Sequence, residues 1–595
     1  MNGTWDLTKL YKDFSDPAFD ADMEALKKLS AEFTEYAGGL TVGKNDGEKL
    51  VRGITLIEDI TKTLYKLAEY ASLTQSADAK NTTASSKLGS IMAISSRTAA
   101  PMASFKKFVA DIPADELESI KKSEPLAAEY SFMLDTIRAD SSHLLDAGSE
   151  EIMARMSLSG SNAWEDLQGY LTSTVPVEYD GRTINLSTVR NLAYDPSPEV
   201  RKNAYEAELA CYDRIKDAVA FALNSIKLET ITESELRGFS SPLDNTLNNS
   251  RMKKETLDAM MSAMEEYMPV FRDYLKAKGR ALGHENGLPW YDLFAPMGKS
   301  GKTYTVEEAK EYLLDIFGGF DTELHDMVKR AFEENWIDFF PRDGKRGGAF
   351  CSGVEAIGES RILTNFDGSF SDIVTLAHEL GHAFHNLCLR DQRILNKDYS
   401  MPVAETASTF NECVVMNAAI SNAEKEIASG NKDAKGELVA LIESQLSDAT
   451  QIICDIYSRF TFEKAVFDNR AEKFMGADEL CEIMLDAQRK SYGDGLDPDC
   501  LHPYMWVCKS HYYGPIYYNF PYAFGGLFAR GLYAQYKAEG AAFLPKYKKL
   551  LHDTSVKTVE DTALIAGIDL TDKKFWESGL ESIAEEIREY IALLG

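Results

Sequence analysis

Apolar residues recur at helical spacing over long parts of the chain. One such face in the first third consists of Leu50, Ile54, Ile57, Ile60 and Leu64. Steps of three and four residues place these side chains on one side of an α-helix, so they indicate an amphipathic helix that packs on a core. The same spacing returns after residue 370 and continues to the C-terminus. The pattern therefore predicts a mainly helical protein.

Two stretches break this spacing and predict small β-structures. Residues 175–179 alternate between apolar and other side chains up to Asp180 and Gly181, which is typical of a hairpin with a two-residue turn. Residues 344–370 are rich in glycine and β-formers and predict two short strands and a turn. The small sheets are expected to lie near the functional site, because the second stretch directly precedes the histidine cluster described below.

A domain boundary is expected just after the hairpin. Residues 197–199 (Ser-Pro-Glu) supply a helix cap, a first-turn proline and a first-turn acid, so they predict a long helix over 198–236. We expect residues 1–190 to form an N-terminal helical domain that ends in the hairpin. Residues 191–595 are expected to form the second domain, which carries the candidate chemistry.

Three of the nine histidines, His378, His382 and His385, cluster in one short segment. The pattern H-E-x-x-H places His378 and His382 one helical turn apart, where both can bind one zinc ion, and it places Glu379 beside them as a general base. By composition alone, a chain of this length contains the pattern with a probability of roughly 0.01. We therefore expect a catalytic metal site here.

A helical wheel separates these histidines from the apolar face of their own segment. At about 100° per residue, the apolar positions of 373–387 centre nearly opposite the three imidazoles. Core histidines would lie within the apolar stripe, so His378 and His382 are better explained as ligands. His385 shares their face, but its i+7 spacing fits no zinc site of this type. It is expected to support the ligands or to line the cleft.

A third ligand must come from outside the motif. Cys388 occupies the position where the longer H-E-x-x-H-x-x-G-x-x-H pattern has its last histidine. Pro402 can begin a new helix, on which Glu405 and Glu412 share one face. We expect Glu405 to be the third ligand and Glu412 to accept the free ring N–H of a ligating histidine. The alternative is that both are solvent-exposed acids.

An aromatic run near the C-terminus offers groups that could stabilise an oxyanion. It begins at His511 and contains Tyr517, Tyr518 and Tyr522. A histidine and tyrosine hydroxyls can donate hydrogen bonds to a developing oxyanion in a water-poor cleft. The alternative is an aromatic packing cluster whose hydroxyls serve only the fold. His502, beside a proline, is expected to be structural.

Two further features could contact a peptide. A strand over residues 348–352 at a sheet edge could pair with an extended peptide through backbone hydrogen bonds. Gly525 and Gly526 could form a hinge for closure, although a tightly packed helix start explains them equally well.

Composition limits the partners and the compartment. The chain has 64 basic and 94 acidic residues, a net charge of −30, which disfavours nucleic acids and anionic membrane surfaces. No apolar run approaches the length of a bilayer span, and the first residues do not resemble an export signal. The eight cysteines are scattered without a C-x-x-C pair, which favours reduced thiols. We expect a cytoplasmic protein that binds neither nucleic acid nor membrane.

These motifs together resemble the thimet-oligopeptidase-like zinc metallopeptidases, on the oligoendopeptidase F branch. The resemblance rests on TLAHELGHAFH at 375–385, VAETASTFNE at 403–412, KRGGAFCS at 345–352 and the aromatic run from His511 to Tyr522. It implies a two-lobed helical ellipsoid around a deep substrate channel that admits short peptides. It also implies that His511 and a tyrosine of the run bind substrate and stabilise the tetrahedral intermediate, with Tyr518 the first candidate and Tyr522 the second.

The resulting hypothesis is a zinc-dependent oligoendopeptidase that cuts internal bonds of short peptides and uses one zinc ion. Cobalt or manganese would fit the same nitrogen and oxygen ligands. Two alternatives remain open at this point. One is a helical zinc carboxypeptidase of similar design, and the other is a peptide-binding protein without catalysis.

Overall fold

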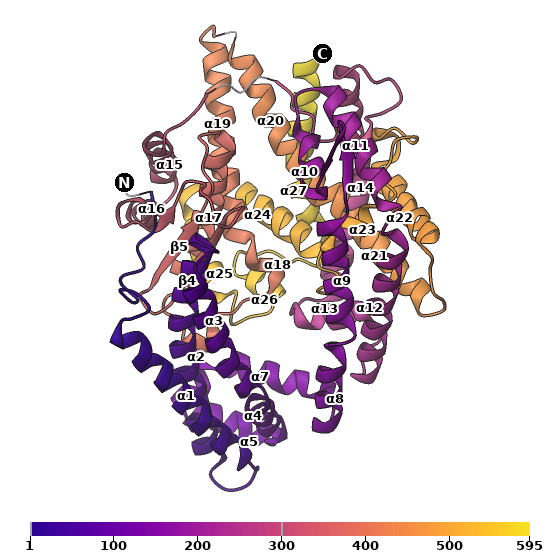
Figure 1. Ribbon diagram of the computed structural model, residues 1–595. Coiled ribbons are helices and arrows are strands. Elements are labelled where there is room, and N and C mark those ends of the chain that lie inside the picture. Colours follow the sequence, from indigo (N-terminus) through magenta and orange to yellow (C-terminus); the bar gives the residue numbers. More distant parts are fainter. Residues whose placement is uncertain (1–2, 299–301, 432) are drawn as a thin grey trace.

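The computed structural model describes residues 3–298, 302–431 and 433–595. It confirms a mainly helical fold with small sheets (Figure 1). In Figure 1 the N-terminal helices lie beside α17, β4 and β5 in one lobe, and α9 to α12 lie with α21 to α23 in the other. Helix α24 runs between the lobes and contacts both α19 and α21.

The helices follow one another in three groups along the chain. The first group comprises α1 (Pro17–Gly38), α2 (Asp46–Ala77), α3 (Thr82–Ser95), α4 (Ala99–Asp111), α5 (Ala114–Ser123), α6 (Pro125–Glu129), α7 (Ser131–Asp140), α8 (Ala147–Ser157) and α9 (Ser161–Thr174). The second comprises α10 (Leu186–Asn191), α11 (Pro198–Tyr212), α12 (Lys216–Leu236), α13 (Pro242–Asn249), α14 (Lys254–Ala281), α15 (Val306–Phe320) and α16 (Thr322–Glu333). The third comprises α17 (Phe370–Cys388), α18 (Met401–Ala404), α19 (Thr406–Ala428), α20 (Ala434–Thr450), α21 (Ile456–Arg470), α22 (Ala477–Tyr492), α23 (Met505–Cys508), α24 (Phe520–Glu539), α25 (Leu544–Asp553), α26 (Val559–Leu564) and α27 (Lys573–Leu594).

The strands form two small sheets, of which the hairpin and strands β4 and β5 lie in the predicted stretches, whereas the short strand β3 precedes the second stretch and was not predicted. Strands β1 (Val177–Tyr179) and β2 (Arg182–Ile184) pair antiparallel around Asp180 and Gly181, both of which have positive φ as the turn requires. In the second sheet β5 (Glu359–Leu363) lies between β4 (Phe350–Val354) and the short β3 (Ile337–Asp338). Strand β4 is therefore at an edge, as expected for residues 348–352.

One predicted helix is wrong in its length. The helix expected over 198–236 is divided at residues 213–215 into α11 and α12. Helix α11 does begin at Pro198, with Ser197 in an extended N-cap conformation. The periodic pattern could not show the break, because Tyr212 and Ile215 on either side of it both pack in the same core.

Three apolar clusters form the interior. The first joins residues 5–134 to Val354 and Leu363 of the second sheet. The second joins residues 175–226 to residues 462–513, and the third and largest is built mainly from elements after residue 247. Because residues on both sides of position 190 share the second cluster, the packing crosses the predicted domain boundary. The division at residue 190 stays a prediction.

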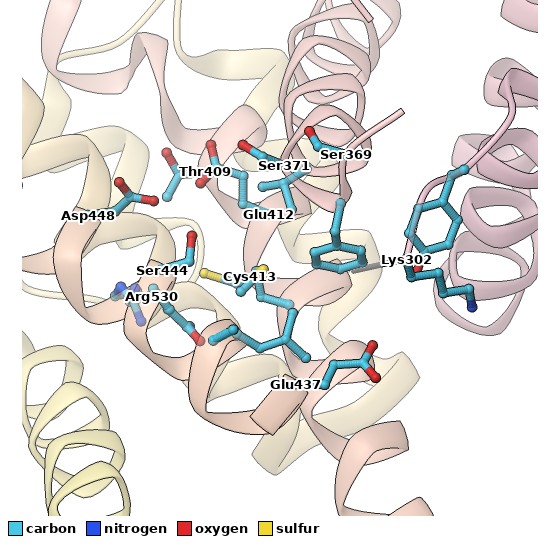
Figure 2. A pocket seen from close by; sticks show the side chains of 17 residues that line it. Lys302, Ser369, Ser371, Thr409, Glu412, Cys413, Glu437, Ser444, Asp448 and Arg530 are labelled. Carbon is cyan, nitrogen blue, oxygen red and sulfur yellow. The ribbon is translucent and has the colours of Figure 1, made fainter. Parts of the chain in front are cut away.

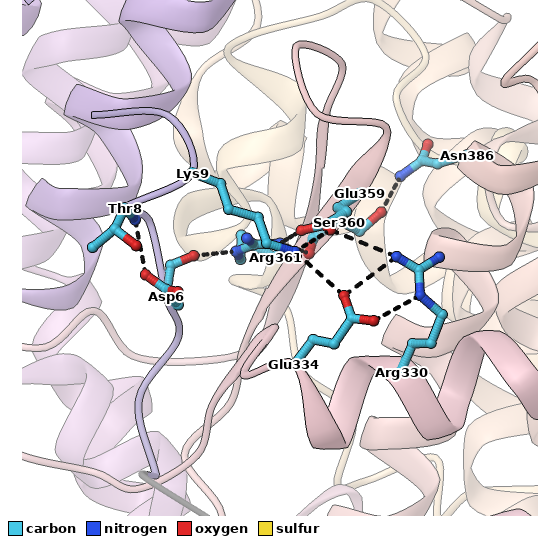
Figure 3. A network of polar contacts seen from close by, with 9 residues as sticks. All are labelled: Asp6, Thr8, Lys9, Arg330, Glu334, Glu359, Ser360, Arg361 and Asn386. Atoms are coloured by element: carbon cyan, nitrogen blue, oxygen red, sulfur yellow. Dashed lines mark hydrogen bonds and ion pairs between the residues drawn. The ribbon is translucent and has the colours of Figure 1, made fainter. Parts of the chain in front are cut away.

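The N-terminal segment crosses onto the second sheet and is fixed there by an ionic network whose centre, Arg361 and Glu359, is buried (Figure 3). Arg361 on β5 is fully buried and donates from Nε to the carbonyl oxygen of Asp6 at 2.8 Å and from Nη1 to Glu359 at 3.0 Å. Lys9 donates to the other oxygen of Glu359 at 2.6 Å. Nδ2 of Asn386 on α17 donates a hydrogen bond to Oγ of Ser360 on the same strand at 3.2 Å. These contacts hold the sheet against α17, which carries the histidine cluster.

In the part of the chain that the structure describes, no helix is both long and apolar enough to span a bilayer.

Candidate active site

Helix α17 presents His378 and His382 on one side, as their spacing predicts. Its first turn is held by a capping box, in which Ser369 and Asp372 each bond the other's backbone N–H. The two Nε2 atoms lie 3.2 Å apart. Both side chains are only partly buried, in contrast to the apolar residues on the opposite face of the helix.

Glu405 brings a carboxylate to the same point from a neighbouring element. It stands between α18 and α19, where the backbone leaves one helix and enters the next. Its Oε2 lies 3.3 Å from Nε2 of His378 and 3.3 Å from Nε2 of His382. Ser408 donates to the same oxygen at 2.7 Å and helps to hold its direction. The predicted set of His378, His382 and Glu405 is therefore brought together.

The three donor atoms have the spacing of ligands in a tetrahedral metal site. Four-coordinate zinc binds nitrogen and oxygen at about 2.0–2.1 Å, so tetrahedral ligands stand roughly 3.3 Å apart. The observed separations of 3.2, 3.3 and 3.3 Å match this value. Two neutral imidazole nitrogens and a carboxylate oxygen are also the donor types that a divalent zinc ion prefers. The residues present therefore fit such an ion.

Close helix packing explains how two elements bring their donor atoms to one point. Gly381 lies where α17 crosses α19, and a Cβ atom there would come within 2.5 Å of the backbone of Ala407 and Ser408. A Cβ on Gly525 would likewise come within 2.9 Å of the Cβ of Glu405. Gly525 is inside α24 and packs against the candidate ligand, so its close packing is observed, while its role as a hinge stays a prediction.

Carboxylates dominate the electrostatics of the site. Burial alone would lower the pKa of His378, but its contacts with Glu405 and Glu412 outweigh that effect and raise the pKa to about 10. Burial would raise the pKa of Glu405, but the hydrogen bonds from the two imidazoles hold it far below its usual range. The arrangement concentrates negative charge at the point where the ring nitrogens converge. A cation is the natural partner of such a point.

Glu379 lies beside the candidate ligands and keeps one oxygen free. Its side chain is 5% exposed, and its Oε2 has no hydrogen-bond partner among the described residues. Burial raises the pKa of this carboxyl, while His378 and His382 oppose the rise. A buried carboxylate with an unused acceptor and a raised pKa is suited to accept a proton from a nearby donor.

Glu412 lies behind His378, as predicted. Its Oε1 accepts the hydrogen bond from Nδ1 of His378. This contact orients the imidazole and leaves Nε2 free to face Glu405. Glu412 also lines a cavity of about 390 Å³ between α17, α19 and α20, together with Asp448 and Arg530 (Figure 2).

The aromatic run brings His511, Tyr518 and Tyr522 together at one place. The ring of His511 lies 5.5 Å from that of Tyr518 and 5.9 Å from that of Tyr522. All three side chains are partly exposed, and Tyr522 also lies near Glu405. Tyr517 differs, because it is buried and packs against aromatic residues of α21. Of the tyrosines proposed from the sequence, only Tyr518 and Tyr522 are therefore placed to reach a ligand.

His511 is held as a neutral imidazole in one tautomer. Burial, together with the nearby cations Arg459 and Lys509, lowers the pKa of His511 to about 4. Arg459 has only N–H donors and lies 3.4 Å from Nδ1 of His511, so Nδ1 is the acceptor. The proton therefore sits on Nε2, which is free to donate.

A buried ion pair holds the loop that carries Tyr518. Lys227 of α12 and Glu463 of α21 are both buried and lie 2.6 Å apart. Glu463 also accepts hydrogen bonds from the backbone N–H of Tyr517 at 3.2 Å and from Asn519 at 2.7 Å. Tyr517 has φ = +51°, a conformation that costs energy for a bulky residue. The two bonds from residues on either side of Tyr518 stabilise this strained turn.

Two other histidines turn out to be structural. His502 is fully buried and lies 3.2 Å from Glu208, as expected. His385 is also fully buried, bonded to Thr554 at 2.8 Å and stacked on Tyr399, and burial lowers its pKa to about 3. The expectation that it lines the cleft is wrong, because α25 and the segment before α18 cover this turn of the helix.

Comparison with known proteins agrees with this geometry. The family model described as Peptidase family M3 matches residues 191–582, and the model described as Oligopeptidase F matches residues 109–175. The chain is 25% identical to oligopeptidase PepF of Bacillus subtilis, over 99% of this chain and 87% of that protein. It is 23% identical to the group B oligopeptidase PepB of Streptococcus agalactiae, over 98% of this chain and 96% of that protein.

Solved structures have the same fold. A crystal structure from Chlamydophila abortus superposes with a TM-score of 0.81 at 20% identity, covering 98% of each chain. Oligoendopeptidase F from Enterococcus faecium superposes with a TM-score of 0.71 at 18% identity, covering 97% of this chain and 98% of that one. The family implies a divalent metal ion, which the donor set described above fits. The chain belongs to peptidase family M3.

Proposed function

We propose that this metalloendopeptidase uses one zinc ion, held by His378, His382 and Glu405, to cut internal bonds of short peptides. The observation that carries the proposal is the triangle of donor atoms with sides of 3.2 to 3.3 Å, beside a buried carboxylate with a free oxygen. The names of the relatives, oligopeptidase and oligoendopeptidase F, support a preference for short peptides.

Glu379 acts as the general base. When bound, the zinc ion acts as a Lewis acid that polarises the scissile carbonyl. Glu379 takes a proton from the attacking water and later gives it to the nitrogen of the leaving amine. Glu412 holds His378 in the tautomer whose Nε2 carries no proton, so that this nitrogen can serve as a ligand.

His511 and the neighbouring tyrosines stabilise the negative charge that develops on the carbonyl oxygen. The neutral His511 donates from Nε2, and the hydroxyls of Tyr518 and Tyr522 are the other donors within the same group. Donors that are fixed before the reaction stabilise an oxyanion without reorganisation. Burial and the charge of Glu379 both raise the pKa of the Cys351 thiol, so the edge strand β4 lies close to Glu379. An extended peptide could pair with this strand through backbone hydrogen bonds.

Products from a set of peptides of increasing length test this function. The zinc-loaded protein should release two shorter peptides from an internal cut, and a chelator should abolish the reaction. Mass spectrometry identifies the products. Sequential release of single C-terminal residues would instead establish a carboxypeptidase, and the absence of chelator-sensitive cleavage would contradict a zinc peptidase.

Glu463→Gln should lower kcat about 10-fold or more with little change in KM, because the turn that carries Tyr518 loses a carboxylate acceptor. The substitution also leaves Lys227 buried without its partner, so Tm should fall. The double variant Lys227→Met/Glu463→Gln removes both charges and should regain part of the Tm while kcat stays low. A double variant with the wild-type kcat would show that the pair serves only the stability of the fold.

A further inference from the structure

A second cavity adjoins the one beside Glu412. It has a volume of about 310 Å³ and lies between α10, α11 and the start of the π-helical turn η6 (Gln451–Asp455). Its aromatic wall includes Tyr194 and Phe294, whose rings lie 4.9 Å apart, and Trp290. Asp448 lines both cavities, so they adjoin at this residue. An aromatic wall of this kind suits an apolar side chain.

Among the described residues, every cation at or beside this cavity except Lys509 forms an ion pair with a carboxylate. The arginines at or beside it each contact a carboxylate: Arg190 with Glu208 at 2.5 Å, Arg201 with Asp292 at 2.7 Å, and Arg459 with Asp455. Lys509 also lines the cavity, and within the described ranges it has neither an ion-pair partner nor a hydrogen bond from Nζ. Asp455 is the carboxylate that acts most strongly on the pKa of Lys509, and it already accepts a hydrogen bond from Arg459.

Among the described residues, Lys509 is therefore the one cation lining this cavity that has no ion-pair partner. Burial disfavours its charged form and lowers the pKa of Lys509, which a bound anion would reverse. The positive charge of Lys509 also acts on His511, two residues further along the chain, because together with burial and Arg459 it lowers the pKa of that imidazole. Asp448 forms no ion pair with Lys509, and burial together with Glu412 raises the pKa of its carboxyl to about 6. The cavity thus combines an apolar wall with one available cation.

We propose that Lys509 binds the α-carboxylate at the C-terminus of the peptide substrate, with the last side chain against Tyr194 and Phe294. This inference rests on the proposed peptidase function. A carboxylate fits the one cation of this cavity that has no ion-pair partner among the described residues, and the aromatic wall fits the side chain that precedes it. Because Lys509 lies two positions before His511, the anchored terminus stands at a fixed distance from the scissile bond. The site would set the number of residues on the C-terminal side of the cut.

Paired substrates test the site in the zinc-loaded protein. A short peptide ending in Phe is compared as the free acid and as the C-terminal amide, and kcat/KM is measured for each. The wild-type ratio of acid to amide should be at least about 10, as for a hydrogen bond to a charged group in a buried site. Lys509→Met should reduce the ratio to near 1, and Lys509→Arg should restore part of it. Lys464→Met on the exposed face of α21 is the matched control and should leave the ratio unchanged.

Binding without turnover separates this inference from the proposed function. Calorimetry with the Glu379→Gln protein should show tighter binding of the acid than of the amide, and the added Lys509→Met substitution should remove the difference. If the wild-type protein cleaves both peptides with a ratio near 1 and binds them equally, the carboxylate site is overturned while the peptidase function stands. A third peptide, the amide with an interior Glu, tests a side-chain carboxylate as the source. If only that peptide shows a preference that depends on Lys509, the assignment to the C-terminus is wrong.

Discussion

Glu379→Gln should lower kcat on the order of 10³-fold and leave the metal content at its wild-type level. The amide keeps the size and one acceptor oxygen of the carboxylate but cannot accept a proton, and general-base catalysis is worth roughly 10² to 10⁴-fold. Glu379 is not among the three converging donor atoms, so metal retention should be unaffected. Elemental analysis and the hydrolysis of a quenched peptide measure the two quantities on one sample.

Two further variants serve as controls for Glu379→Gln. Glu424→Gln, on the exposed part of α19, should retain wild-type activity. Glu379→Asp keeps the base but withdraws it by one methylene, so its activity should fall between those of Gln and the wild type. A Glu379→Gln protein that holds its metal and still turns over at more than a tenth of the wild-type rate would show that another group takes the proton.

The convergence of the two histidines could be predicted from the sequence because its geometry is local. His378 and His382 are related by one helical turn, and a helix fixes their separation without knowledge of the fold. Glu405 needed one further assumption, that the next helix returns alongside the first. Gly381 makes that return possible by allowing α17 and α19 to touch, and its role is visible only once the two backbones are in place.

The group formed by His511, Tyr518 and Tyr522 is harder to predict from the sequence, because it depends on an irregular loop. The sequence offered Tyr517, Tyr518 and Tyr522 with no periodicity to choose among them. The strained turn at Tyr517 buries that ring and exposes the next one. The groups that hold this turn, Lys227 and Glu463, lie far from it in the chain and belong to helices whose apolar pattern gives no sign of the pair.

His385 shows the limit of reasoning from one helix. The helical wheel of residues 373–387 places His385 on the side of α17 opposite the apolar stripe. It could not show that other parts of the chain cover that turn, since Thr554 and Tyr399 come from distant segments. The same limit applies to Lys509, whose missing partner is a property of several packed elements.

Glu405→Ala should weaken metal binding by at least about 100-fold and abolish hydrolysis at limiting zinc. Loss of a supporting partner of a ligand costs roughly 10 to 100-fold in affinity, and loss of a ligand should cost more. Competition with a chromophoric chelator measures the dissociation constant independently of activity.

Glu412→Gln is the graded control for that experiment, because Glu412 contacts His378 without facing the centre of the triangle. It should weaken metal binding by roughly 10 to 100-fold, less than Glu405→Ala. A thermal melt of each metal-free variant checks the fold, since Glu405 also packs against Gly525 of α24. If Glu405→Ala kept wild-type metal affinity with an unchanged melt, the third ligand would have to be another group. The close approach of Glu405 to both imidazoles would then reflect charge pairing alone.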